Sequence, residues 1–243
     1  SDAAAAQPAQ ADGARRRNRR GGRGRAAAAK GAAPQSAAAS ARPVREIHPV
    51  LLQLAQLYPA LFGDSPKPLK RGIFQDLQVA QGEALDKDGL KQALALHTRS
   101  TRYLNVVATG AARCDLQGVE VEAMAPEHVL HALIEVFRRR QQRTQEDLTP
   151  KLRNRIVIAY EASGLTREEY AERVQGRDEK TNALVVDALA EADARAAKDE
   201  ALLRSFQLSG QTSEQEFAEM YGMNPRQVAQ QLERARRRQQ NIQ

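Results

Sequence analysis

The sequence has no tryptophan, five tyrosines, five phenylalanines and a single cysteine, Cys114. One cysteine excludes an intramolecular disulfide and any metal site built from several cysteines. No apolar run approaches the ~20 residues that a membrane-spanning helix needs, and no apolar signal-peptide core follows the first basic residues. We therefore expect a soluble, cytoplasmic protein.

The N-terminal segment also lacks large apolar side chains. Alanine is the only apolar residue type in residues 1–41, which otherwise consist mostly of Gly, Arg, Gln and Ser. Such a segment cannot bury enough surface to offset the conformational entropy of its chain. The composition predicts a disordered Arg/Gly/Ala-rich tail over residues 1–46, followed by a part that is long enough to form a core.

Most of the net charge of +7 lies in this tail: residues 1–41 carry +6, residues 47–143 carry +2 and residues 144–243 carry −2. A basic tail on a nearly neutral body indicates a polyanionic partner held by a flexible arm. We expect the Arg/Gly cluster to bind RNA backbone without reading its sequence; a tail that only improves solubility remains the alternative. The arginines of this auxiliary arm are Arg15, Arg16, Arg17, Arg19, Arg20, Arg23 and Arg25.

From residue 47 the pattern is mainly helical. Apolar residues recur at spacings of three and four after Pro49, again from Ile73 (with Val79 in the stripe), and in a third helix that Asp88 can cap. Residues 112–114 and 119–121 predict two short strands joined by the turn Asp-Leu-Gln-Gly. A further helix is expected to open at Pro126.

Residues 144–243 predict an all-α extension that is slightly acidic. A helix opens near Pro150 and ends at Gly164, and Thr166 begins a capping-box sequence. Residues 213–238 have the pattern of a helix–turn–helix unit, which could place a helix on nucleic acid. An ordinary helical hairpin fits the same pattern. The predicted organisation is a tail (1–46), a domain (47–143) and a helical extension (144–243).

Three segments of the predicted domain combine core-forming residues with cationic or hydroxyl side chains. They are PLKRGIFQDL (68–77), LHTRSTRYL (96–104) and GAARCDLQG (110–118). Phosphate recognition requires this combination, because a packed scaffold must hold Lys, Arg, Ser, Thr and Tyr outward in defined positions. We expect the three segments to form one RNA-binding face, on which Tyr103 offers a ring for base stacking.

At these segments the chain resembles the ProQ/FinO family of bacterial RNA-binding proteins, over about residues 47–143. The resemblance implies a mainly helical domain with a short hairpin. It also implies an RNA chaperone that recognises terminator-type stem-loops together with their single-stranded 3′ tail. Post-transcriptional regulation through small RNAs and mRNA 3′ ends would be its role, while the Tudor-like C-terminal domain of some members has no counterpart here.

Position by position, the resemblance implies an RNA-binding role for residues in all three segments and in the predicted helix that leads into the second segment. The family's second cation in that helix is replaced by Ala95, and Arg99 can compensate for it. His97 and Thr101 stand where the family commonly has Tyr and Trp. The residues expected to bind RNA are Lys70, Gly72, Lys91, Thr98, Arg99, Ser100, Arg102, Tyr103 and Arg113.

Catalysis and metal binding are not expected. His128 and His131 are spaced to share a metal on a helix, but no further ligand is placed by spacing. Cys114 in a strand without a nearby base predicts a buried thiol, and the arginines of residues 138–143 predict a solvated helix end. The expectation is a non-enzymatic protein without cofactor or metal. The competing hypothesis is a DNA-binding regulator that uses residues 213–238, with the central domain as a dimerisation or docking module.

Overall fold

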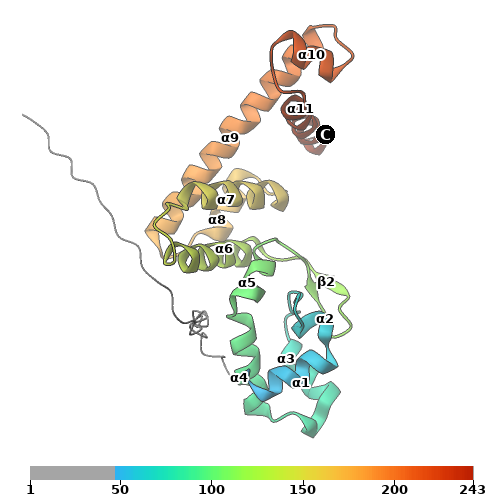
Figure 1. Ribbon diagram of the computed structural model, residues 1–243, viewed down its shortest axis with the longest axis vertical. Helices are drawn as coiled ribbons and strands as arrows, with labels where there is room; N and C mark the ends of the chain where they lie inside the picture. The colour runs from blue at the N-terminus through green and yellow to red at the C-terminus, as the bar shows by residue number, and fades with distance from the viewer. Residues whose placement is uncertain (1–46, 243) are drawn as a thin grey trace, which may run out of the picture. The chain divides into compact units, whose positions relative to one another are not determined.

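The computed structural model describes residues 47–242, in which helices dominate and two short strands form a hairpin (Figure 1). The predicted fold class is confirmed, while the predicted tail and its arginines lie outside the described residues. The elements in chain order are α1 (Pro49–Leu57), α2 (Pro59–Phe62), α3 (Ile73–Gln81), the short helix η1 (Gly82–Ala84), α4 (Lys87–Thr98), α5 (Thr101–Val107), β1 (Arg113–Cys114), β2 (Glu120–Glu122), α6 (Pro126–Gln141), α7 (Thr149–Ser163), α8 (Arg167–Val174), α9 (Glu179–Leu208), α10 (Glu214–Met220) and α11 (Pro225–Ile242).

Proline and side-chain caps determine where most helices begin. A proline in the first turn loses no helical hydrogen bond, because its missing N–H would have had no partner there. Prolines occupy this place in α1, α2, α6, α7 and α11. Capping side chains begin α4, α5, α8, α9 and α10, where they accept hydrogen bonds from first-turn N–H groups: Asp86, Ser100, Thr166, Asp178 and Ser213.

The start of α4 differs from the prediction. Asp86, not Asp88, is the N-cap: its carboxylate accepts from the N–H of Gly89 at 2.6 Å, and Asp88 lies in the first turn. Both aspartates suit a helix start. The backbone of the preceding loop decides between them, because Asp86 has the non-helical dihedrals of a cap (φ −55°, ψ 131°).

The buried face of α3 also differs at one position. Ile73 and Leu77 are buried as expected, but Val79 is 87% exposed. Each residue turns a helix by about 100°, so a residue two places after Leu77 points roughly to the opposite side. The apolar pattern of the sequence therefore overstated the width of this helix's buried stripe.

The hairpin is present, and its second strand lies one residue later in the sequence than predicted. Its pairs are Arg113 with Glu122 and Cys114 with Glu120, with an irregular register between them. The carboxylate of Asp115 accepts from two N–H groups of the turn, and Gly118 has a φ of 77°, which only glycine adopts easily. The predicted turn chemistry is confirmed.

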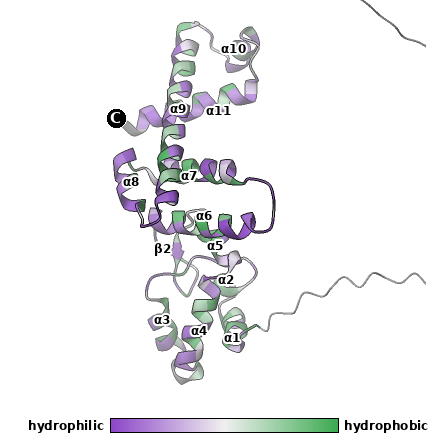
Figure 2. Cartoon of the chain, turned by 90° about the vertical axis from the view of Figure 1, so that its left-hand side faces the viewer, coloured by the Kyte–Doolittle hydropathy of each residue, from purple (hydrophilic) through white to green (hydrophobic). Residues whose placement is uncertain are grey.

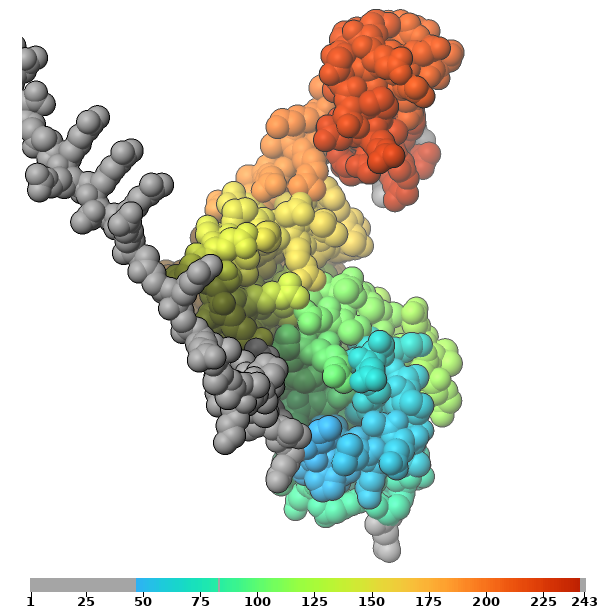
Figure 3. Space-filling view, in the orientation of Figure 1, coloured from blue at the N-terminus to red at the C-terminus, as the bar shows by residue number. Residues whose placement is uncertain are grey.

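One hydrophobic core joins α1–α6 to α7, α8 and the first part of α9. α6 packs on α5 at one side and on α7 and α8 at the other, and these helices contain hydrophobic residues, coloured green in the cartoon of Figure 2. In the space-filling view the green and yellow surfaces of α6 and α7 adjoin without a break (Figure 3). The predicted boundary at residues 143/144 thus crosses a shared core, and it stays a prediction.

A second hydrophobic cluster lies where α9 meets α10 and α11 (Figure 1). Inside it, Asp199 has no exposed surface and binds Arg234 through two hydrogen bonds of 2.9 Å and Arg238 through one of 2.6 Å. These contacts hold α11 on α9. No helix in residues 47–242 is long and apolar enough to cross a membrane.

Candidate nucleic-acid interface

The three segments singled out in the sequence meet at Leu69. The backbone of the first segment pairs with β1: the N–H of Cys114 donates to Pro68 O at 2.7 Å, and the N–H of Lys70 donates to Cys114 O at 2.9 Å. The second segment joins them through the Tyr103 hydroxyl, which accepts from the N–H of Leu69 at 2.9 Å. Residues more than thirty positions apart therefore share one buried, hydrogen-bonded junction, which we call the Leu69 junction (residues 68–70, 103, 113 and 114).

Arg113 reinforces this junction from β1. Its Nη1 donates to Leu69 O at 2.9 Å, its Nη2 lies 3.3 Å from His128 Nδ1, and its Nε is buried without a hydrogen-bond partner among residues 47–242. The side chain is half-buried. Part of its hydrogen-bonding capacity is thus used inside the protein, and only the remainder faces outward.

Tyr103 does not provide the exposed ring that was expected. It is 6% exposed and lies on the inward face of α5 with Leu104 and Val107. Burial raises the pKa of its phenol, so the hydroxyl stays protonated. The stacking role was wrong, because the cap at Ser100 starts α5 in a register that turns position 103 into the core. Tyr103 supports the Leu69 junction from within.

His97 completes the packing beneath Tyr103. Its ring centroid lies 4.8 Å from that of Phe62 and 5.1 Å from that of Tyr103. Burial lowers the pKa of His97 to about 4, so the imidazole is neutral near pH 7. The departure from Tyr at this position is therefore accommodated by a neutral core histidine.

Two of the predicted cations carry partners of opposite charge. Lys70 Nζ lies 2.6 Å from Asp76, and Arg102 lies 3.3 Å from Asp64. The Arg102–Asp64 pair is exposed and therefore worth little, whereas Lys70 and Asp76 are each only about a third exposed. Gly72, with a φ of 80°, is the N-cap of α3 two residues after Lys70 and permits the tight turn there.

Lys91, Thr98, Arg99 and Ser100 lie on α4 and at its junction with α5. The side chains of Lys91 and Arg99 are exposed, and within the described part of the chain neither has a hydrogen-bond or ion-pair partner. The hydroxyl of Thr98 donates to Leu94 O at 2.8 Å, while that of Ser100 accepts from the N–H of Tyr103 at 3.1 Å. Both hydroxyls thus serve the helices, and no contact joins Lys91 or Arg99 to the Leu69 junction within residues 47–242.

The arginines at the end of α6 were predicted to form a solvated helix end, and Arg138, Arg140 and Arg143 are exposed as predicted, while Arg139 is half-buried. Arg139 Nη1 donates to Arg99 O and to Thr101 Oγ1, both at 2.9 Å. Arg140 donates to Asn105 at 3.3 Å, and Arg138 binds Asp178 at 2.8 Å. The sequence did not reveal these contacts, because the partners are 35 to 40 positions away.

The remaining expectations concern metals and the thiol. Cys114 is buried, as predicted. Among residues 47–242 there is no group of three or more His, Cys, Asp or Glu that could hold a metal ion. The ring of His128 instead contacts Arg113.

The fold and these contacts define a class of module. It is a mainly helical domain in which a hairpin, a loop and a helix start are held at one junction, with cationic and hydroxyl groups on the segments that form it. Residues 44–149 match the model of the ProQ/FINO family. This region of the chain is a ProQ/FINO family domain, so the family resemblance of the sequence is confirmed.

Relatives match the same part of the chain. "RNA chaperone ProQ" of Idiomarina loihiensis is 44% identical over 88 residues, which are 34% of this chain and 42% of the relative. That of Vibrio vulnificus is 43% identical with the same coverage. The NMR solution structure of a ProQ homolog from Legionella pneumophila has 31% identity and a TM-score of 0.34, covering 44% of this chain and 93% of that chain. The chain thus spans about two fifths of the length of the curated relatives it matches.

Proposed function

We propose that residues 47–143 bind structured RNA, and that the partner is a terminator-type stem-loop with a single-stranded 3′ tail. The observation that supports this proposal is the Leu69 junction. It joins all three family motifs and so determines the positions of Lys70 and Arg113. The relatives are named RNA chaperone ProQ, and this name supports RNA as the partner.

The binding residues act through charge and shape. A-form RNA is recognised mainly by its backbone and 2′-hydroxyl groups, since its deep major groove is closed to side chains. Lys70, Arg102 and Arg113 contact the phosphates near the junction, and Lys91 and Arg99 add contacts along α4. Gly72, Thr98 and Ser100 shape the turns that present these cations, and Tyr103 positions the backbone of Leu69.

The chaperone activity and the role in post-transcriptional regulation by small RNAs follow from the same binding. In this proposal the Arg-rich arm at residues 15–25 contacts RNA without sequence preference. Its charge reduces the repulsion between two RNA strands, which helps them to exchange partners. No step of this mechanism requires a cofactor or a catalytic group.

The test measures fluorescence anisotropy of a 5′-labelled stem-loop with a free 3′ tail. Two further ligands are the same stem-loop without its tail and a DNA duplex with the stem sequence. We expect the full chain to bind the tailed stem-loop most tightly. Lys91→Ala should weaken this binding roughly tenfold and reduce the salt slope by about 1, because one phosphate contact is lost.

Lys198→Ala on α9 is the matched control, since it removes an exposed lysine outside the proposed face. Affinity unaffected by tail removal would refute recognition of the 3′ end. Equal effects of the two lysine substitutions would refute the location of the face. In this proposal the Arg-rich arm contributes equally to the affinity for every ligand, so the comparison uses the ratios of the dissociation constants between ligands.

The competing DNA-binding hypothesis finds little support in the C-terminal helices. Arg234 and Arg238 on α11 are held by buried Asp199, and Arg236 and Arg237 pair with Glu214 and Glu233. A recognition helix needs cations and polar groups that are free to reach the DNA. Tighter binding of the DNA duplex than of the stem-loops would revive this hypothesis.

A further inference from the structure

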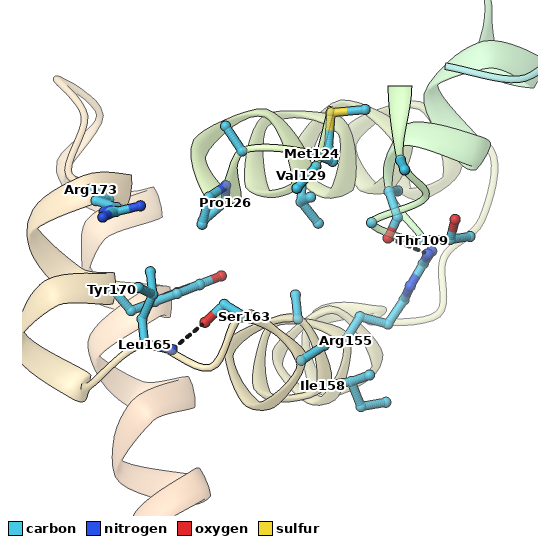
Figure 4. A pocket seen from close by; sticks show the side chains of 17 residues that line it. Thr109, Met124, Pro126, Val129, Arg155, Ile158, Ser163, Leu165, Tyr170 and Arg173 are labelled. Carbon is cyan, nitrogen blue, oxygen red and sulfur yellow. Dashed lines mark hydrogen bonds between the residues drawn. The ribbon is translucent and has the colours of Figure 1, made fainter. Parts of the chain in front are cut away.

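A cavity of about 710 Å³ lies between the family domain and the helical extension (Figure 4). Its walls are the loop after α5, the segment before α6 with the first turn of α6, one side of α7, and the middle and end of α8. Several of the lining positions are Ala or Gly, and these small residues leave the space open. Its volume falls within the range of ordinary small-molecule sites.

The walls are largely apolar. Met124 and Val129 line the side of α6, and Ile158 and Leu165 line the opposite side. Ile158 is 52% exposed although it faces the cavity. A ligand with an apolar body would cover this surface and gain the free energy of its burial.

One buried polar group is directed into the cavity. Tyr170 is 0% exposed, and its hydroxyl has no hydrogen-bond partner among residues 47–242. Figure 4 shows this hydroxyl pointing into the space between the first turn of α6 and α7. Burial raises the pKa of Tyr170 to about 12, so the group is a neutral donor at any ordinary pH. Ser163, by contrast, is satisfied by Tyr160 O and the N–H of Leu165.

Two arginines give the cavity a positive charge. Arg155 is half-buried and reaches Ala108 O at 3.5 Å, and burial together with the nearby Arg140 lowers its pKa. Arg173 lies near Tyr170 at the other end (Figure 4). Within the described residues neither arginine is in a salt bridge; Glu169, one turn before Arg173, is engaged with Thr166 at the start of α8. Guanidinium groups without a carboxylate partner favour an anion.

From these features we infer that the cavity is a binding site for a small organic anion with a ring-sized apolar body and one carboxylate or sulfonate group. The apolar body lies between α6 and α7. Tyr170 donates a hydrogen bond to the ligand, and Arg173, which lies near Tyr170, binds its charged group. None of the residues proposed to bind RNA lines this site, although Gly110 and Ala112 of the third segment do, and the site joins the domain to the extension.

The probe is 1-anilinonaphthalene-8-sulfonate, which combines a fused aromatic body with one anionic group. It is titrated into the full chain without RNA, and fluorescence is recorded. We expect one saturable site with a blue-shifted emission. Ala162→Phe, which fills the cavity from its exposed side, and Arg173→Gln should each weaken binding roughly tenfold, and Tyr170→Phe roughly threefold.

Matched controls lie on nearby surfaces outside the cavity: Ala197→Phe on α9 and Arg177→Gln before it, both exposed in the wild type. These should bind the probe like the wild type. The absence of saturable binding, or equal losses in the controls and the cavity variants, would overturn the proposal. Circular dichroism of each variant separates loss of the site from loss of the fold, and the RNA titrations above do not depend on this result.

Discussion

At the scale of single residues, Leu69 shows how the candidate site is assembled. Its N–H donates to Tyr103, its carbonyl accepts from Arg113, and its neighbours pair with Cys114. A backbone so closely tied leaves little freedom for Lys70, which follows it. Positioning of this kind matters because phosphate contacts lose strength when the cation must first be ordered.

This role of Tyr103 can be tested by removing only its hydroxyl. Tyr103→Phe keeps the buried ring and leaves the N–H of Leu69 without an acceptor, which should cost about 1–3 kcal/mol in the free energy of unfolding. Urea denaturation measures the loss, and the RNA titration should show weaker binding. Tyr160→Phe is the control, because no hydrogen bond of its hydroxyl occurs among residues 47–242. Equal stability of the two variants would show that the Leu69 contact contributes nothing.

At the scale of elements, most helix starts follow from local rules. Proline in the first turn and Ser, Thr or Asp at the cap act within four residues, so they can be read from the sequence. One exception is α3, which begins at Gly72 without a proline or a capping side chain, and in α4 two aspartates compete for the cap. The hairpin turn at Asp115 likewise follows from local chemistry, whereas the inward register of α5 does not.

The two aspartates of α4 provide a matched pair. Asp86→Ala removes the cap that accepts from Gly89 and should lower the free energy of unfolding by about 1 kcal/mol. Asp88→Ala should cost only a few tenths of that amount, since it loses just the favourable interaction of a carboxylate with the helix N-terminus, roughly 0.3 kcal/mol. Thermal or urea denaturation of both variants measures the difference. The reverse order would place the cap at Asp88.

At the scale of the whole chain, two hydrophobic clusters share the long helix α9. The first unites the family domain with α7 and α8, and the second holds α10 and α11. Asp199 and its two arginines belong to the second cluster. Separate clusters along one helix allow the end of the chain to open without loss of the rest.

Asp199→Asn tests this independence. The substitution leaves Arg234 and Arg238 without a buried counter-charge, and the loss should be roughly 3–5 kcal/mol. We expect faster amide hydrogen exchange in α10, α11 and the end of α9, with α4–α7 unchanged. Glu233→Gln, which removes an exposed pair with Arg237, should leave exchange nearly as it was. Faster exchange throughout the chain would show a single cooperative unit instead.

The sequence alone was enough to predict the helical class, the hairpin, the family domain and the burial of Cys114. These features depend on residue types at short spacing, and on motifs whose order along the chain can be compared directly. It also identified the segments that meet at Leu69, although not how they meet.

Only the tertiary structure decided which side chains of those segments face inward. It turned Tyr103 into the core, gave Arg113 a contact with Leu69 O, joined Arg139 to Arg99, and left a cavity beside Tyr170. Each of these outcomes depends on how helices far apart in the chain pack against one another. A rotation of α5 by about 100°, the angle between successive residues, would exchange a buried ring for an exposed one, and no local pattern specifies that rotation.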